Sequence, residues 1–129
     1  MNARDLLHEL HASLSERYQG DCTDYATRLA EMLLAEGRAP WIGRVRHEEN
    51  GMRMPLIPSR YLGHGAIAWT THYVACADGE AWEPILGEPV AIDSYTTTLF
   101  GEPYALAMCV DEHETARLVA SGSLRSRLL

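Results

Sequence analysis

The chain has 129 residues, of which 47% are hydrophobic and 22% are charged, as is usual for one globular domain covering residues 1–129. A formal net charge of −7 and a pI near 5.3 disfavour binding to a phosphate backbone, so we expect no nucleic-acid partner. The apolar runs are too short and too interrupted to span a bilayer, so we expect no membrane span and no membrane partner.

The N-terminal region and the cysteines indicate a reducing compartment. The residues after Met1 pass directly into a charged amphipathic pattern, without the apolar segment of a secretory signal. Cys22, Cys76 and Cys109 are odd in number and lack metal-type spacing, as expected for free thiols. We therefore expect a cytoplasmic protein without a metal or other cofactor, and export by a route that needs no cleaved signal stays open. The oligomeric state is not indicated.

Two helices are expected first. Apolar residues at helical spacing predict a helix over residues 3–18, which Gly20 is expected to end. A second helix is predicted to begin at Asp21–Cys22 and to run to Glu36, with Gly37 as its C-terminal stop. Its apolar residues fall in one stripe that begins with Cys22, so this stripe should face the core.

The middle of the chain is expected to form strands. Residues 41–47 have the pattern of a short strand, and the Gly- and Pro-containing residues 48–65 that of a long loop. Residues 66–77 are rich in β-branched and aromatic side chains, and Asp78-Gly79 is the strongest hairpin signal in the chain. Residues 80–86 are predicted to return as the partner strand.

The last third of the chain is expected to add a helix, a strand and another helix. A short helix is predicted with Asp93 or Ser94 as its N-cap and Gly101 as its end, followed by an apolar strand over residues 104–110. A capping-box pattern at Asp111 predicts the final helix. The resulting order α-α-β-β-β-α-β-α indicates an α+β fold with helices packed on a small antiparallel sheet.

Cys22 is the first candidate for chemistry. A thiol is a useful nucleophile mainly as the thiolate, and the N–H groups and partial positive charge of a helix N-terminus favour that anion. The predicted helix start places Cys22 at such a position. The alternative is that Cys22 is a small hydrophobic residue of the apolar stripe, which is the more frequent role of an isolated cysteine.

The predicted hairpin would place a histidine and a carboxylate together. With Asp78-Gly79 as a two-residue turn, His72 and Glu83 lie on one face of the hairpin as diagonal neighbours. A carboxylate beside an imidazole fixes its tautomer and supports its charged form, as a base that activates a thiol requires. A register shifted by one residue would send both side chains to the other face, and this alternative stays open.

Together these residues resemble a known superfamily. The run Gly-Asp-Cys-Thr-Asp-Tyr-Ala at residues 20–26 is similar to the nucleophile helix of transglutaminase-like and papain-like cysteine enzymes. Their histidine strand and the acid strand after it are similar to four later runs: Thr71–Val74, Asp78-Gly79, Trp82–Pro84 and Gly87–Pro89. The combination looks most like compact bacterial papain-fold domains, some of which are secreted effectors or toxins. It covers roughly residues 18–101.

The resemblance implies a papain-like or transglutaminase-like fold and a Cys–His–acid triad that acts on an amide or thioester carbonyl. Cys22 would be the nucleophile, His72 the base and then the acid, and Glu83 the orienting carboxylate. The family usually has Asp or Asn where Glu83 stands, so Asp93 is an alternative third member, although a helix cap suits it better. The Cys22 backbone N–H would line an oxyanion hole, with Gln19 as a candidate second donor.

Two functional classes follow. The first is a thiol-dependent hydrolase or acyl transferase (peptidase, deamidase, amidase or transglutaminase-like enzyme) with a protein or peptide substrate. The second is a non-catalytic protein-binding domain, such as an adaptor or an immunity-type partner, that keeps the same fold.

Overall fold

The computed structural model describes residues 1–14, 18–58, 71–110 and 112–124. Along these residues the elements follow the order α1-α2-β1-β2-β3-β4-β5-α3-β6-α4. Every strand pairing among them is antiparallel, so the expected α+β class with an antiparallel sheet is confirmed. The strands β2 and β5 were not predicted.

Helix α1 spans Ala3–Ala12 and is shorter than the predicted helix. It begins with a capping box, in which the Asn2 side chain accepts from the Asp5 N–H and the Asp5 side chain accepts from the Asn2 N–H. Its last turn is closed by Ser13, whose backbone N–H and hydroxyl both donate to the Glu9 carbonyl. The serine therefore ends the helix where apolar periodicity alone predicted that it would continue.

Helix α2 spans Tyr18–Ala35, and its predicted start is wrong. Gly20 lies inside α2, and Cys22 is the fifth residue of the helix. A glycine weakens a helix interior by about 1 kcal/mol, which a long buried stripe outweighs. That stripe is buried at Ala26, Leu29, Ala30 and Leu33. Gly37, at φ +78°, follows the helix end as predicted.

One six-stranded sheet has the order β2-β1-β3-β4-β5, with β6 paired to β1. Its strands are β1 (Trp41–Glu49), β2 (Met52–Met54), β3 (His72–Ala77), β4 (Glu80–Trp82), β5 (Val90–Ala91) and β6 (Ala105–Val110). Strand β1 is the centre of the sheet because it pairs with β2, β3 and β6.

A hairpin at Asn50-Gly51 replaces the first part of the predicted loop. β1 continues to Glu49 and turns back into β2 through Asn50 and Gly51, whose φ angles are +52° and +77°. Positive φ at both central residues is the backbone of the tight hairpin turn that Asn-Gly favours. The predicted loop over residues 48–65 is therefore wrong as far as Met54, and its residues 59–65 lie outside the described part of the chain.

The predicted β3–β4 hairpin and its register are confirmed. Asp78 and Gly79 have φ angles of +54° and +76°, and Ala77 pairs with Glu80 across them. Residues 66–70 of the predicted strand lie outside the described residues. β4 is shorter than predicted because the chain turns after it, where Pro84 has no N–H to donate to a sheet.

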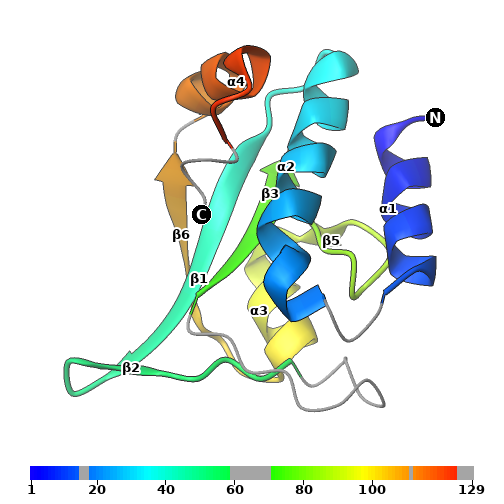
Figure 1. Ribbon diagram of the computed structural model, residues 1–129. Coiled ribbons are helices and arrows are strands. Elements are labelled where there is room, and N and C mark those ends of the chain that lie inside the picture. Colours follow the sequence, from blue (N-terminus) through cyan, green and yellow to red (C-terminus); the bar gives the residue numbers. More distant parts are fainter. Residues whose placement is uncertain (15–17, 59–70, 111, 125–129) are drawn as a thin grey trace.

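Helices cover both faces of the sheet (Figure 1). Residues of α1, α2 and α4 (Glu112–Ser121) form one apolar cluster with Ala75 and Ala77 of β3. Residues of α3 (Ile92–Phe100) form another with Val74 and Cys76, the alternate residues of the same strand. The side chain of Cys22 belongs to this second cluster.

Helix α3 starts earlier than predicted. Its N-cap is Ala91, with no side-chain cap bond, so the predicted cap role of Asp93 or Ser94 is wrong. Asp93 instead lies in the first turn, where a carboxylate complements the helix dipole. Gly101, at φ +81°, ends the helix as predicted.

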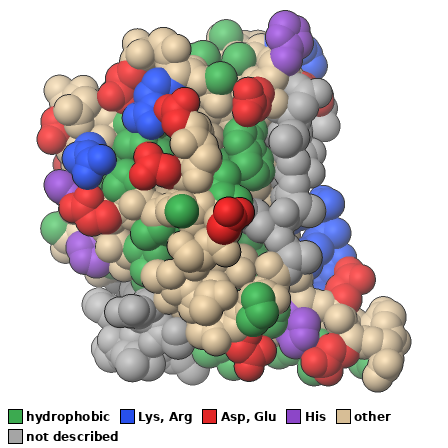
Figure 2. Space-filling view, turned by 180° about the vertical axis from the view of Figure 1, so that it is seen from behind, with side chains coloured by type: hydrophobic (Ala, Val, Ile, Leu, Met, Phe, Trp, Pro, Cys, Tyr) green, Lys and Arg blue, Asp and Glu red, His purple; other side chains and the backbone are tan. Residues whose placement is uncertain are grey.

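The face of the molecule seen in Figure 2 carries acidic side chains around and between apolar patches, with fewer basic ones, as the net charge of −7 implies. Within the described residues, no helix has both the length and the apolar character needed to cross a membrane.

Candidate active site

The β3–β4 hairpin joins His72 to Glu83. His72 is the first residue of β3, and Glu83 directly follows β4. In the observed register their side chains meet, and His72 Nε2 lies 2.5 Å from Glu83 Oε1. Both side chains are fully buried, so this ion pair is shielded from solvent. The predicted juxtaposition of the two residues on one face is therefore confirmed.

Cys22 reaches the same imidazole from α2. Its side chain is only 6% exposed, and its interaction with His72 raises the pKa of that imidazole. The structure thus brings the three predicted residues together at one buried site.

Electrostatic interactions favour the proton of the His72–Glu83 pair on His72. Burial lowers the pKa of His72, but the charge of Glu83 and the hydrogen bonds with Cys22 and Glu83 raise it, and the net pKa is about 10. The direction of this shift favours the imidazolium at neutral pH. An imidazolium beside a thiol is the arrangement that stabilises a thiolate.

Tyr95 completes the surroundings of the carboxylate and was missed by the sequence reasoning. Its hydroxyl donates to Glu83 Oε1 at 2.6 Å, and the Ile85 N–H approaches Oε2 at 3.4 Å. Burial, and then the charge of Glu83, raise the pKa of Tyr95 well above its ordinary value, so the phenol stays protonated. The available signal was that Tyr95 and Leu99 form one apolar face of α3, where a buried hydroxyl needs a partner.

A tight turn fixes the backbone of Glu83. Its carbonyl accepts from the N–H groups of Leu86 and Gly87, at 3.0 and 3.1 Å. The next carbonyl, of Pro84, accepts from Nδ1 of His11 on α1, at 2.8 Å. At Gly87, with φ +76°, an added Cβ would lie 2.9 Å from the His11 ring, so α1 packs on this turn without room for a side chain.

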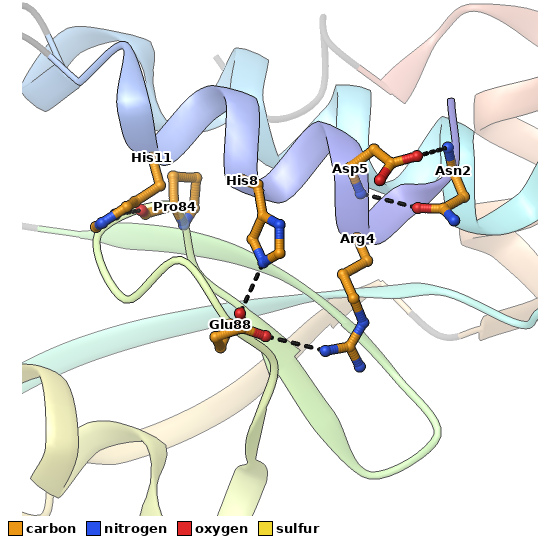
Figure 3. Close-up of polar contacts among 7 residues, drawn as sticks. All are labelled: Asn2, Arg4, Asp5, His8, His11, Pro84 and Glu88. Carbon is orange, nitrogen blue, oxygen red and sulfur yellow. Dashed lines mark hydrogen bonds and ion pairs between the residues drawn. The ribbon is translucent and has the colours of Figure 1, made fainter.

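Two exposed ion pairs continue the contact of α1 with this segment, as Figure 3 shows. Glu88 accepts from Arg4 at 2.9 Å and lies 2.7 Å from Nε2 of His8. All three side chains are more than half exposed, so each pair contributes little to stability. The positioning of the turn depends mainly on His11 and the close approach at Gly87.

The corrected start of α2 changes the expected source of activation. Only the first N–H groups of a helix lack intrahelical acceptors, and the effect of the dipole falls off within the first turn. As the fifth residue, Cys22 lies beyond those groups, so its predicted position at the helix N-terminus is wrong, and the oxyanion role of its N–H stays a prediction. Gln19 lies in the first turn, and its side chain is outside the described part. The group beside Cys22 that favours a charged partner is therefore His72 and not the helix N-terminus.

The remaining candidates do not join the site. Asp93 is exposed on α3, whereas the carboxylate that contacts His72 is that of Glu83. Among the described residues, no three His, Cys, Asp or Glu side chains are grouped as a metal ion would require. The ring of Phe100 meets His72 edge-on, with 6.4 Å between ring centroids, and gives the imidazole an apolar wall.

Comparisons with family models, curated proteins and solved structures found no match for this chain. Its functional interpretation therefore rests on the residues and geometry described above.

Proposed function

We propose that this chain is a thiol-dependent hydrolase or acyl transferase with a papain-like or transglutaminase-like fold, acting on amide bonds of a protein or peptide. The observation that carries the proposal is the buried His72–Glu83 pair, with the buried Cys22 side chain acting on the same imidazole. A buried imidazolium with a thiol on one side and a carboxylate on the other matches the requirements of a nucleophile, a base and an orienting group.

The proposed reaction proceeds through a thioester. The Cys22 sulfur attacks the amide carbonyl carbon, the C–N bond breaks, and His72 gives a ring proton to the departing amine. Water then attacks the thioester and passes a proton to His72, which releases the carboxylic acid and regenerates the thiolate. An amine in place of water would make the second step a transfer.

A second candidate function is a non-catalytic protein-binding domain that keeps the same arrangement. The observation that favours it is the low exposure of Cys22, at 6%, because a nucleophile must be reached by its substrate. In that case the Cys22–His72–Glu83 contacts would only satisfy buried polar groups.

Site-selective alkylation separates the two candidates. In the enzyme, iodoacetamide at about pH 6 should modify Cys22 far faster than Cys76, because Cys22 acts on the imidazole of His72. Cys76 is a suitable internal control because it is buried in the same apolar cluster. Equal and slow reaction of both thiols, read by peptide mass spectrometry, would favour the binding domain.

Turnover assays test the same assignment. Ammonia release from glutamine-containing proteins, peptide cleavage and toxicity in a bacterial host should all be lost in Cys22→Ala and His72→Ala, whereas Glu83→Gln should retain a residue of activity. Cys76→Ala is the matched control, since it removes a buried thiol of the same cluster. If wild type and Cys22→Ala behave alike in every assay and bind the same partner, the enzyme proposal is wrong.

A further inference from the structure

The oxygen of Glu83 that contacts His72 is shared with a second donor. Oε1 lies 2.5 Å from His72 Nε2 and accepts from the Tyr95 hydroxyl at 2.6 Å. All three side chains are fully buried, so water does not substitute for any of these contacts. The carboxylate therefore depends on these donors for its charge and its orientation.

We propose that Tyr95 is a positioning residue of the site, which keeps the carboxylate of Glu83 ionised and aimed at His72 and so keeps the proton of the pair on the imidazole. This assignment rests on the proposed function and adds a fourth group to it. Tyr95 acts through Glu83 and is not itself a catalytic residue.

The direction of the effect of Tyr95 on His72 follows from which groups hold the protons. Tyr95 stays protonated because burial, followed by the charge of Glu83, raises its pKa well above the ordinary value. A permanent donor to Oε1 makes Glu83 a weaker base. The proton between Glu83 and His72 therefore stays on the ring nitrogen. Without the phenol, the proton moves toward the carboxylate, and the imidazolium that supports the Cys22 thiolate is diminished.

Tyr95 also explains why the carboxylate at position 83 can belong to a glutamate and not to an aspartate. A glutamate side chain has one more rotatable bond than an aspartate, so its carboxylate needs a further contact to hold one orientation. The hydroxyl of Tyr95 supplies that contact from α3. Glu83→Asp would draw the carboxylate back by about 1.5 Å, the length of one C–C bond, and away from both donors.

The titratable groups that act on Tyr95 are Glu83, Cys76 and Cys22, and Glu83 joins it to His72. A variant that removes only the hydroxyl, Tyr95→Phe, leaves the ring in place among them. A matched control is Leu99→Val, one turn later on the buried face of α3, which perturbs packing without removing a polar group. Both variants are expected to lower stability, so stability alone does not test the proposal.

The test is the pH profile of Cys22 alkylation, with His72 protonation followed by NMR. In Tyr95→Phe we expect Cys22 to react about tenfold more slowly near pH 6, as the loss of one hydrogen bond to a charged group implies, and the profile to shift to higher pH. Leu99→Val should keep the wild-type profile. In a Glu83→Gln background, Tyr95→Phe should cause no further shift, because its route of action is already removed.

Three results would overturn the assignment. An unchanged profile in Tyr95→Phe, with wild-type Cys22 activated, would remove Tyr95 and leave the proposed function standing. The same shift in Leu99→Val would show that packing of α3 is responsible. If wild-type Cys22 reacts as an ordinary thiol, the proposed function fails and the role of Tyr95 fails with it.

Discussion

Replacing Glu83 with glutamine should deprive His72 of its proton at neutral pH. Glutamine has nearly the same size, and its amide oxygen can accept from both His72 and Tyr95, so the change removes mainly the charge. Burial lowers the pKa of His72, and the charge of Glu83 is the first of the influences that raise it. With that charge gone, burial should dominate, and the pKa of His72 should fall to its ordinary value or below.

The loss of stability expected in Glu83→Gln can be estimated in two ways. The rise in the pKa of His72 from 6.5 to about 10 corresponds to a net preference for the imidazolium of about 5 kcal/mol. Removing one partner of a buried ion pair independently costs about 3–5 kcal/mol of stability. Both routes point to a loss of several kcal/mol, so Glu83→Gln should be clearly less stable than wild type.

NMR of the His72 ring between about pH 5 and about pH 10.5 measures the expected change in its pKa. The chain has six histidines, so a His72→Gln variant is needed to assign the resonance. We expect a protonated ring throughout the neutral range in wild type and a neutral ring at pH 7 in Glu83→Gln. If His72 titrates near 6.5 in both proteins, the electrostatic account of the site is refuted.

Two further predictions concern stability. Because the pKa of His72 is raised on folding, the stabilisation from its protonation is complete below pH 6.5 and is lost as the pH rises toward about 10. The free energy of unfolding, measured in denaturant, should therefore fall over this pH range. The fall should be less steep in His72→Gln. Gly87→Ala should cost about 1–3 kcal/mol more than Gly79→Ala. Both glycines have φ +76°, but only at Gly87 would the new Cβ meet the His11 ring. Equal shifts of the two denaturation midpoints would contradict this role of His11.

The His72–Glu83 pair was predictable because local rules determine it. The Asp78-Gly79 dipeptide specifies a two-residue turn, that turn sets the register, and strand alternation then places both side chains on one face. No long-range packing is needed for this step. The interaction of Cys22 with His72 was expected from the resemblance and not from such local rules.

The features that local sequence rules did not predict depend on competition and packing between elements. Gly20 favours a helix end locally, but the buried stripe of α2 extends the helix through it. Asn50-Gly51 is also a dipeptide that favours a tight turn, yet the exposed Glu48 and Glu49 before it lack the apolar alternation of a strand. Tyr95 becomes part of the site only through the packing of α3 on the sheet, which periodicity does not specify.

The spacing of the site residues along the chain divides the assembly of the site during folding into two stages. His72 and Glu83 are 11 residues apart and are joined by a hairpin, an element that closes in roughly microseconds. Cys22 belongs to a helix that must dock on β3 from a distant part of the chain, a non-local contact that forms more slowly. We therefore expect His72 and Glu83 to meet before Cys22 arrives. If His72 activates Cys22 as proposed, a chain that has formed the hairpin but not docked α2 should carry a less reactive cysteine, and the alkylation rate of Cys22 should report completion of the fold.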